Sequence, residues 1–457
     1  MTDLLVSACD VVATMDDAGT EIAGGSILIR DGAIAWVGTN PPEDAAGVPE
    51  LDGRGAVAVP GLVNTHHHLM QCMTRARAQT SGLFDWLRTL YPVWAEVDPE
   101  WMEVAASVAL AELALSGCAT TTDHHYVFPA GRGDLLAAEI GVARSLGVRF
   151  HPNRGSMDMG ESAGGLPPDA VVQEPEAILA ETEEAVRRHH DPEPGAMVRI
   201  AVGPCSPFTA SDALMRESAA LARSLGVRLH THIAETVDEE EFCLDRFGTR
   251  PVDLLADQGF LGEDVWLAHC VHLSEDDVRR IADAGTGVAW CPSSNLRLGS
   301  GVAPARALLD AGARVGLGVD GSASNDAGNL LAEARTGMLV ARAAGDPAAM
   351  EAREALRVAT RGGAACLGRD DIGSIEPGKR GDLALFPVDD LGTAGADADL
   401  LASLLHAAPR RVRHLVVEGR PVVRDGRLAT GDEDEIAARG HDLGRRIAER
   451  SREGVAR

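Results

Sequence analysis

Lysine is almost absent from this chain of 457 residues. Of its 42 basic residues only Lys379 is a lysine, and all the others are arginines. A phosphate-binding loop and a kinase-type ATP site both use a lysine, and a Schiff-base enzyme forms its imine on one. These three mechanisms are therefore excluded everywhere except at Lys379.

Positive charge is scarce in total as well. The 42 Lys and Arg stand against 69 Asp and Glu, which gives a net charge of −27 at pH 7. Such a surface repels phosphate backbones and anionic lipid headgroups. We therefore expect neither a nucleic-acid nor a membrane partner, and a small-molecule substrate becomes the more natural ligand.

Clustered cysteines and long apolar runs are missing too. The eight cysteines contain no C-x-x-C pair, so the sequence predicts buried thiols rather than a disulfide framework or a thiolate zinc site. The first 15 residues lack the basic segment of a signal peptide. No run of about 18 apolar residues suggests a membrane helix. These absences predict a cytoplasmic protein.

What the chain does have is a regular order of elements. Residues 59–370 alternate apolar strands with Ala-, Leu- and Glu-rich helices, which predicts an α/β fold of the (β/α)₈ barrel type. Residues 1–58 and 371–430 carry short β patterns and are expected to form one small β domain, followed by a helical tail at 431–457. The apolar strand candidates of the barrel region are Ala58–Leu62, Val198–Val202, Val227–His232, Val265–Cys270, Gly287–Cys291 and Val315–Val319.

Polar residues follow four of these strands, at the ends where such barrels build active sites. His66 and His68 come after the first strand, and alternation along an extended chain places both on one face. His230 and His232 alternate in the same way on a later strand. The two remaining strand ends carry a histidine and a carboxylate, His269 and Asp320. Imidazoles with one carboxylate suit Zn²⁺ or Fe²⁺, so we predict one divalent metal per chain.

The motifs PGLVNTHHH, HTHIAET, LAHC and GLGVDGSASN, in this order, resemble the amidohydrolase superfamily and, within it, the deaminase and chlorohydrolase subgroup with a single metal. The segment 372–382 is similar to that family's return to its β domain. The resemblance implies a distorted barrel, a β-sandwich-like domain formed by both chain ends, and a homo-oligomer. It implies these site residues: metal ligands His66, His68, His232 and Asp320, the proton shuttle Glu235, and His269 as the residue that polarises water or substrate, with Asp320 also catalytic.

The missing lysine narrows the family further. Many members hold two metals bridged by a carboxylated lysine on the fourth barrel strand. Here that strand, at about 198–205, reads VRIAVGPC and contains no lysine. A carbamate-bridged site is therefore excluded, and hydrolytic deamination of a ring is favoured.

Two residues are candidates for contacts to a planar base. Gln71 lies three residues after His68 and can both donate and accept hydrogen bonds, which matches a purine or triazine edge; alternatively it is an exposed loop residue. Trp94 can stack on a planar ring but cannot pair with a ribose diol, which favours a free base over a nucleoside. Trp86 could stack instead, or both tryptophans could belong to the core.

Three more residues have open roles. Cys205, at the end of strand four, could contact the substrate or be a buried structural thiol. Arg154 could bind an anionic or carbonyl edge, or form a structural salt bridge. His125, near the end of the second strand, could face the pocket.

The blocks LFDWLRTLYPVWA, NRGSMDMGES and GPCSPF resemble deaminases of this subgroup that act on oxidised purines. They imply metal-dependent hydrolytic deamination of a free purine base, with 8-oxoguanine giving urate and ammonia. The alternatives are an s-triazine aminohydrolase of the hydroxyatrazine type and a guanine or isoguanine deaminase. A catalytically silent amidohydrolase-like scaffold is disfavoured, because every expected ligand position is filled.

Overall fold

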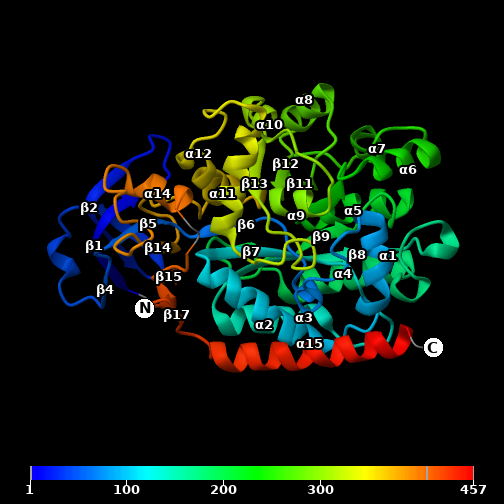
Figure 1. The fold of residues 1–457 in the computed structure, drawn as a ribbon, viewed down its shortest axis with the longest axis horizontal. Helices are drawn as coiled ribbons and strands as arrows, with labels where there is room; N and C mark the ends of the chain where they lie inside the picture. The colour runs from blue at the N-terminus through cyan, green and yellow to red at the C-terminus, as the bar shows by residue number, and fades with distance from the viewer. Residues whose placement is uncertain (1–2, 408–409, 456–457) are drawn as a thin grey trace.

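The computed structural model describes residues 3–407 and 410–455, and it separates into two parts (Figure 1). Within these residues, eight parallel strands close into a barrel, and nine strands drawn from both chain ends form a separate sheet. The predicted α/β barrel with a β unit built from both ends is therefore confirmed.

The barrel wall is built from short parallel strands whose residues are almost all buried. Burial on both faces is expected where helices cover a parallel barrel from outside. The strands, in order around the wall, are β6 (Leu62–Asn64), β7 (Cys118–His125), β8 (Arg149–Ser156), β9 (Ala201–Pro204), β10 (Arg228–Ile233), β11 (Val265–His269), β12 (Gly287–Trp290) and β13 (Arg314–Leu317).

Helices surround the barrel, and several begin at a side chain that caps the first turn. At α8, Ser274 and Asp277 form a capping box, each accepting a backbone N–H from the other. The α-helices are α1 (Leu83–Trp94), α2 (Pro99–Leu115), α3 (Leu135–Leu146), α4 (Pro175–His189), α5 (Asp212–Leu225), α6 (Val237–Phe247), α7 (Pro251–Asp257), α8 (Glu275–Asp283), α9 (Pro292–Arg297), α10 (Ala305–Asp310), α11 (Leu330–Ala341), α12 (Ala352–Arg357), α13 (Gly363–Cys366), α14 (Leu400–His406) and α15 (Glu433–Val455).

The end sheet interleaves the two chain ends. Its central pairing is antiparallel, between β5 and β14, and β1 continues the sheet in parallel with β5. The strands are β1 (Leu4–Ala13), β2 (Glu21–Arg30), β3 (Ala33–Gly38), β4 (Glu50–Asp52), β5 (Ala56–Pro60), β14 (Leu383–Pro387), β15 (His414–Val417), β16 (Arg420–Arg424) and β17 (Arg427–Leu428).

Two strand predictions differ from the structure. Ala58–Leu62 is not one barrel strand: β5 ends at Pro60 in the end sheet, and β6 begins at Leu62 in the barrel. Gly61 makes this change possible, because a Cβ there would lie 2.4 Å from that of Ala119. Ile372–Ile375, at the start of the β pattern predicted for 371–430, forms a bend rather than a strand. Its Gly373 has a φ of +89°, and its Ile375 packs into the core of the end sheet.

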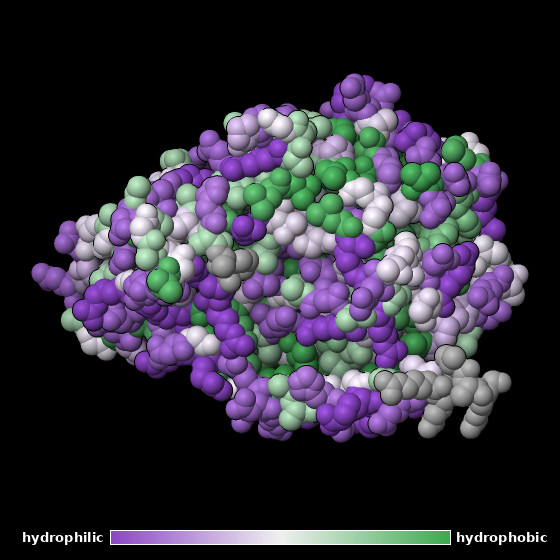
Figure 2. Space-filling view, viewed as in Figure 1, coloured by the Kyte–Doolittle hydropathy of each residue, from purple (hydrophilic) through white to green (hydrophobic). Residues whose placement is uncertain are grey.

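The final described helix, α15, lies along α2 and the short 3₁₀ helix η2 (Leu69–Thr74), as the red ribbon in Figure 1 shows. Leu443 and Ile447 are buried in this contact. On the face shown in Figure 2 hydrophilic residues predominate, in keeping with the acidic composition. Among the described helices none is both long and apolar enough to cross a bilayer.

Candidate metal centre and substrate cavity

Four predicted side chains converge at the carboxyl ends of the barrel strands. His66 and His68 follow β6, His232 lies in β10, and Asp320 comes three residues after β13. Asp320 Oδ1 lies 3.4 Å from His66 Nε2 and 3.3 Å from His68 Nε2. The Nε2 atoms of His68 and His232 are 3.1 Å apart. All four side chains are buried.

These distances match the donor spacing around one small cation. Ligand atoms at about 2.05 Å from a tetrahedral ion are roughly 3.3 Å from one another. His66 Nε2 is buried and has no hydrogen-bond partner among the described residues, so its lone pair is available. The four residues therefore fit a divalent metal, and the predicted metal cofactor is supported.

The outer nitrogens of two of these imidazoles are held by backbone carbonyls. His68 Nδ1 lies 2.8 Å from the carbonyl oxygen of His124, and His232 Nδ1 lies 2.6 Å from that of Cys205. A carbonyl can only accept, so both Nδ1 atoms carry the proton. The Nε2 lone pairs of His68 and His232 consequently point toward the metal position.

His66 is held by a side chain instead. Its Nδ1 lies 2.8 Å from His230 Nε2, and His230 Nδ1 donates to the carbonyl of Trp266, also at 2.8 Å. His230 therefore accepts a hydrogen bond from His66 and leaves His66 Nε2 free for a metal. The sequence alternation placed His230 on the face of His232, but it did not reveal this orienting role.

Asp320 is fixed by three donors and a strained backbone. The hydroxyls of Ser294 and Ser324 donate to Oδ2 at 2.5 and 3.0 Å, and the Gly321 N–H donates to Oδ1 at 2.7 Å. Its φ of +61° is uncommon for a residue with a side chain and is typical of functional sites. Burial alone would favour the neutral acid, but the neighbouring imidazoles, His66 first among them, hold the pKa of Asp320 well below its usual range.

Glu235 and His269 form a second pair beside the metal position. Glu235 Oε2 lies 3.5 Å from His269 Nε2, and Ser300 donates to Glu235 Oε1 at 3.3 Å. The Asn295 side-chain amide, 3.2 Å away, donates to His269 Nδ1, so His269 Nε2 carries the proton that faces Glu235. Burial, and next the charge of Asp320, raises the pKa of Glu235 well above its usual range. Burial lowers the pKa of His269 to about 4, which keeps it neutral.

A small cavity adjoins these residues. Three residues that the sequence suggested as substrate contacts, one of them as an alternative, line its wall. Gln71, Trp86 and Cys205 line it together with His68, His232, Glu235, His269 and Asp320. Gln71 Nε2 donates to the hydroxyl of Tyr126 at 3.3 Å, whereas Gln71 Oε1 is buried and has no partner among the described residues. Gln71 is thus not an exposed loop residue, and it offers a free acceptor beside the cavity.

The structure does not bring Trp94, Arg154 or His125 to the cavity wall. Trp94 is buried behind Trp86, with ring centroids 5.2 Å apart, and its indole N–H donates to a threonine hydroxyl. Trp86, the alternative stacking residue, lines the cavity instead.

Arg154 and His125 lie on the outer side of the barrel wall. The Arg154 guanidinium bonds to Glu181 at 2.5 Å and covers the ring of Phe128 at 3.7 Å, so of its two possible roles the structure shows the salt bridge. His125 packs edge-on against the same Phe128 ring, 4.6 Å away. Neighbouring positions on β7 and β8 face opposite sides of the wall, and the sequence did not settle which side these two residues take.

A parallel eight-stranded barrel with imidazoles and one carboxylate at its carboxyl end is typical of a metal-dependent hydrolytic enzyme. The model of the amidohydrolase family matches residues 57–422. The chain belongs to the amidohydrolase family, and it is a hydrolase of that family, as its motifs predict.

Relatives and solved structures are similar over nearly the whole chain. The 8-oxoguanine deaminase of Pseudomonas aeruginosa is 49% identical over 92% of this chain and 94% of that protein. Hydroxydechloroatrazine ethylaminohydrolase of Pseudomonas sp. strain ADP is 38% identical over 98% of this chain and 96% of that protein. The crystal structure of atrazine chlorohydrolase from Arthrobacter aurescens TC1 complexed with zinc matches with a TM-score of 0.92 at 35% identity, covering 96% of this chain and 100% of that chain.

Proposed function

We propose that this protein is a metal-dependent deaminase that hydrolyses the free base 8-oxoguanine to urate and ammonia. The observation that carries the proposal is the 49% identity with the 8-oxoguanine deaminase of Pseudomonas aeruginosa over 92% of the chain. The cavity supports it, because an amide and an aromatic ring line the same space as the metal-binding candidates.

Gln71 and Trp86 would bind the base. The buried, unpartnered Oε1 of Gln71 can accept an N–H from the edge of a purine. The Trp86 indole is held by its N–H bond to the carbonyl of Ala323 at 3.1 Å, so its ring has a fixed position for stacking. Cys205 adds a small thiol contact to the wall. The proposal requires no contact to a ribose, since the base alone is recognised.

We propose Zn²⁺ as the metal, held by His66, His68, His232 and Asp320. Three imidazoles and a carboxylate suit zinc, and a solved relative is complexed with zinc. When bound, such an ion supplies Lewis-acid activation of water near neutral pH. Fe²⁺ suits the same donors, so metal analysis of the protein purified without added metal decides between the two.

Proton transfers fall to Glu235 and His269. The reaction forms a C2–O bond, breaks the bond from C2 to the exocyclic nitrogen, and moves one water proton to the ring and one to the leaving amine. Glu235, whose pKa is raised by burial, accepts and releases these protons at its carboxyl oxygens. His269 keeps its proton on Nε2, 3.5 Å from Glu235, and donates a hydrogen bond to the oxygen that adds to C2. Asp320 accepts from that same oxygen.

The test is a steady-state assay of ammonia release from 8-oxoguanine, guanine, isoguanine and hydroxyatrazine. We expect the largest kcat/KM for 8-oxoguanine. A clearly larger value for any of the other three compounds overturns the substrate assignment but leaves the deaminase proposal in place. No ammonia release from any heterocycle by a protein that holds its metal overturns both.

A second candidate function is the hydrolysis of an s-triazine. It is favoured by the 38% identity with hydroxydechloroatrazine ethylaminohydrolase and by the likeness to the zinc-complexed atrazine chlorohydrolase. The hydroxyatrazine arm of the same assay distinguishes it. We also propose a homo-oligomer, from the family resemblance, which light scattering after size-exclusion chromatography tests.

A further inference from the structure

A cavity of about 380 Å³ opens at the end of the barrel opposite the metal centre; we call it the basal cavity. Its lining residues come from the amino-terminal parts of β8 and β10, from the segments just before β9, β10 and β11, and from nearby helix ends and loops: His151, His190, Pro192, Arg199, Arg223, Gly226, Val227, Arg228, Asp264 and Gly368. Arg228 and His232 are four residues apart on β10, which is roughly 13 Å at about 3.3 Å per residue. The basal cavity is therefore separate from the substrate cavity.

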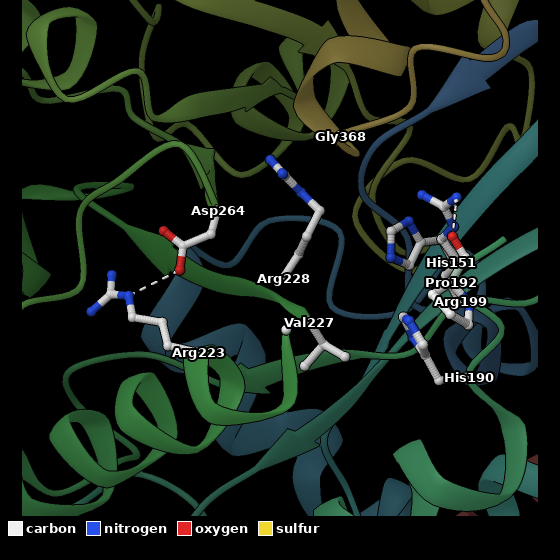
Figure 3. A pocket seen from close by; sticks show the side chains of 10 residues that line it. His151, His190, Pro192, Arg199, Arg223, Val227, Arg228, Asp264 and Gly368 are labelled. Atoms are coloured by element: carbon white, nitrogen blue, oxygen red, sulfur yellow. Dashed lines mark hydrogen bonds and ion pairs between the residues drawn. The ribbon is translucent and has the colours of Figure 1, made fainter. Parts of the chain in front are cut away.

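Figure 3 shows how the charges lie in the basal cavity. On one side Arg223 and Asp264 form an ion pair, with Arg223 Nε 3.0 Å from Asp264 Oδ2. His151, His190 and Arg199 lie on the other side, and Arg228 stands between the two groups. Asp264 is the one carboxylate among the described lining residues, and it is already paired.

Arg199 and Arg228 have no carboxylate partner among the described residues. The Arg228 guanidinium donates to the carbonyl of Cys366 at 2.7 Å and lies 5.9 Å from the Trp266 ring centroid. Arg199 donates to backbone carbonyls as well, that of Pro192 among them, at 3.1 Å. The Nε–H groups of both arginines are buried without a partner in the described chain. Two guanidinium groups thus line the basal cavity, and each has an N–H donor without a partner in the described chain.

The surroundings make these charges costly. Burial lowers the pKa of Arg228 to about 10 and lowers that of Arg199 as well. His151, of which 2% is exposed, lines the same cavity, and its Nδ1 has no hydrogen-bond partner among the described residues. A buried charge needs a counter-charge that also satisfies its hydrogen bonds, and elsewhere in this acidic chain arginines are paired with carboxylates.

We propose that the basal cavity binds the phosphate group of a small organic molecule. The planar forks of Arg199 and Arg228 suit the oxygens of a phosphate, which can accept from both at once. His151 and His190 supply further ring nitrogens in the same wall. The volume of about 380 Å³ exceeds what an inorganic ion needs and leaves room for a sugar-sized group.

The test measures binding by calorimetry, with inorganic phosphate and ribose 5-phosphate as probes and chloride keeping the ionic strength constant. We expect saturable binding of both, tighter for ribose 5-phosphate. Arg228→Met and Arg199→Met should each weaken binding at least tenfold, and Arg228→Lys should weaken it less than Arg228→Met. Arg188→Met, which removes an arginine already paired with Asp134 on the surface, is the matched control and should bind like the unaltered protein.

Three results overturn the proposal, the first two in full and the third in part. One is the absence of saturable binding of either probe by the unaltered protein. A second is equal binding by the unaltered protein and a folded Arg228→Met variant, with folding checked by thermal unfolding and metal content. If inorganic phosphate binds as tightly as ribose 5-phosphate, the ligand is the free ion, and the assignment of an organic phosphate is overturned. None of these measurements uses deamination, so the outcome is independent of the proposed function.

Discussion

His230 shows how a single side chain outside the metal-binding set can control it. It accepts from His66 Nδ1 and is itself held by the Trp266 carbonyl. His230→Phe keeps the ring volume and removes the acceptor, so His66 is free to take the wrong tautomer. We expect metal affinity to fall about 10–100-fold, measured by competition with a chelator. His441→Gln, at an exposed position on α15, serves as the control, and unchanged affinity in His230→Phe would contradict the orienting role.

Glu235 is expected to matter for turnover and not for metal binding. Its carboxyl group lies next to His269 and Ser300 and is not one of the four converging donors. Glu235→Gln keeps the shape but cannot carry a proton, so ammonia release should fall by about 10²–10⁴-fold while metal content stays at one ion per chain. Near-normal turnover in the Glu235→Gln variant would remove Glu235 from the mechanism; loss of the metal would make it a structural residue.

Among single residues, the sequence identified those whose position depends on local spacing and missed those whose position depends on contacts with distant parts of the chain. His66 and His68 could be predicted because strand alternation fixes their common face. Trp94 could not be separated from Trp86, since both lie in one helix and only the packing of α1 decides which ring meets the cavity. Arg154 finds Glu181 on another element, and no local pattern reports that contact.

Strands β7 and β8 are the elements that the apolar patterns did not mark. β7 reads CATTTDHH, yet every residue in it is buried. Some of its polar groups find partners within the barrel: Thr122 donates to the carbonyl of His151, and Asp123 Oδ1 accepts from the N–H of Leu69. A strand whose polar residues find partners only in the folded barrel cannot be recognised from hydrophobicity.

The contact of β7 with α3 contains a buried acid pair, which predicts a pH effect on stability. Asp123 and Glu139 lie together with His125; burial raises the pKa of Asp123 to about 7 and that of Glu139 well above its usual range. The folded state therefore binds protons more tightly than the unfolded state. The stabilisation is fully present below about pH 4 and is lost as the pH rises toward 7.

The variant Asp123→Asn tests this effect, because its amide cannot ionise but can still accept from Leu69. Between pH 4 and pH 7 the free energy of unfolding should fall in both proteins. The fall should be smaller in Asp123→Asn, by roughly 2–4 kcal/mol, as measured by urea unfolding at each pH. Asp85→Asn, on the exposed side of α1, should leave the pH dependence unchanged. Parallel curves for Asp123→Asn and the unaltered protein would rule out the ionisation of this pair.

Helix α15 is expected to contribute to stability through few apolar contacts. Leu443 and Ile447 are the residues that it buries most deeply against the barrel helices. Leu443→Ala should lower the free energy of unfolding by about 2–4 kcal/mol, as measured by urea unfolding. Arg445→Ala, on the exposed face of the same helix, should change it by less than about 0.5 kcal/mol. Equal effects of the two substitutions would mean that α15 does not depend on this packing.

At the scale of the whole molecule, the metal centre joins three separate parts of the barrel wall. Its candidate ligands follow β6, lie in β10 and follow β13, and His66 and Asp320 are more than 250 residues apart in the chain. Removing the ion leaves closely spaced, buried polar groups, so a chelator should lower the midpoint of thermal unfolding. With free metal at 100–1,000 times its Kd, the difference is about 3–4 kcal/mol. A His66→Ala variant should respond far less, and an equal response would place the stabilising ion elsewhere.

The end sheet has a consequence for synthesis on the ribosome. β5 ends at Pro60, while β14, its partner, begins only at Leu383. At about 5–20 residues per second, the hydrogen-bonding edge of β5 waits roughly 15–65 s for the strand that covers it. During that time an apolar edge is open to other chains. The end sheet can therefore complete its pairing only after the carboxyl-terminal strands have been synthesised. A truncation before β14 would leave a complete barrel beside a sheet whose β5 edge is unpaired and prone to aggregation.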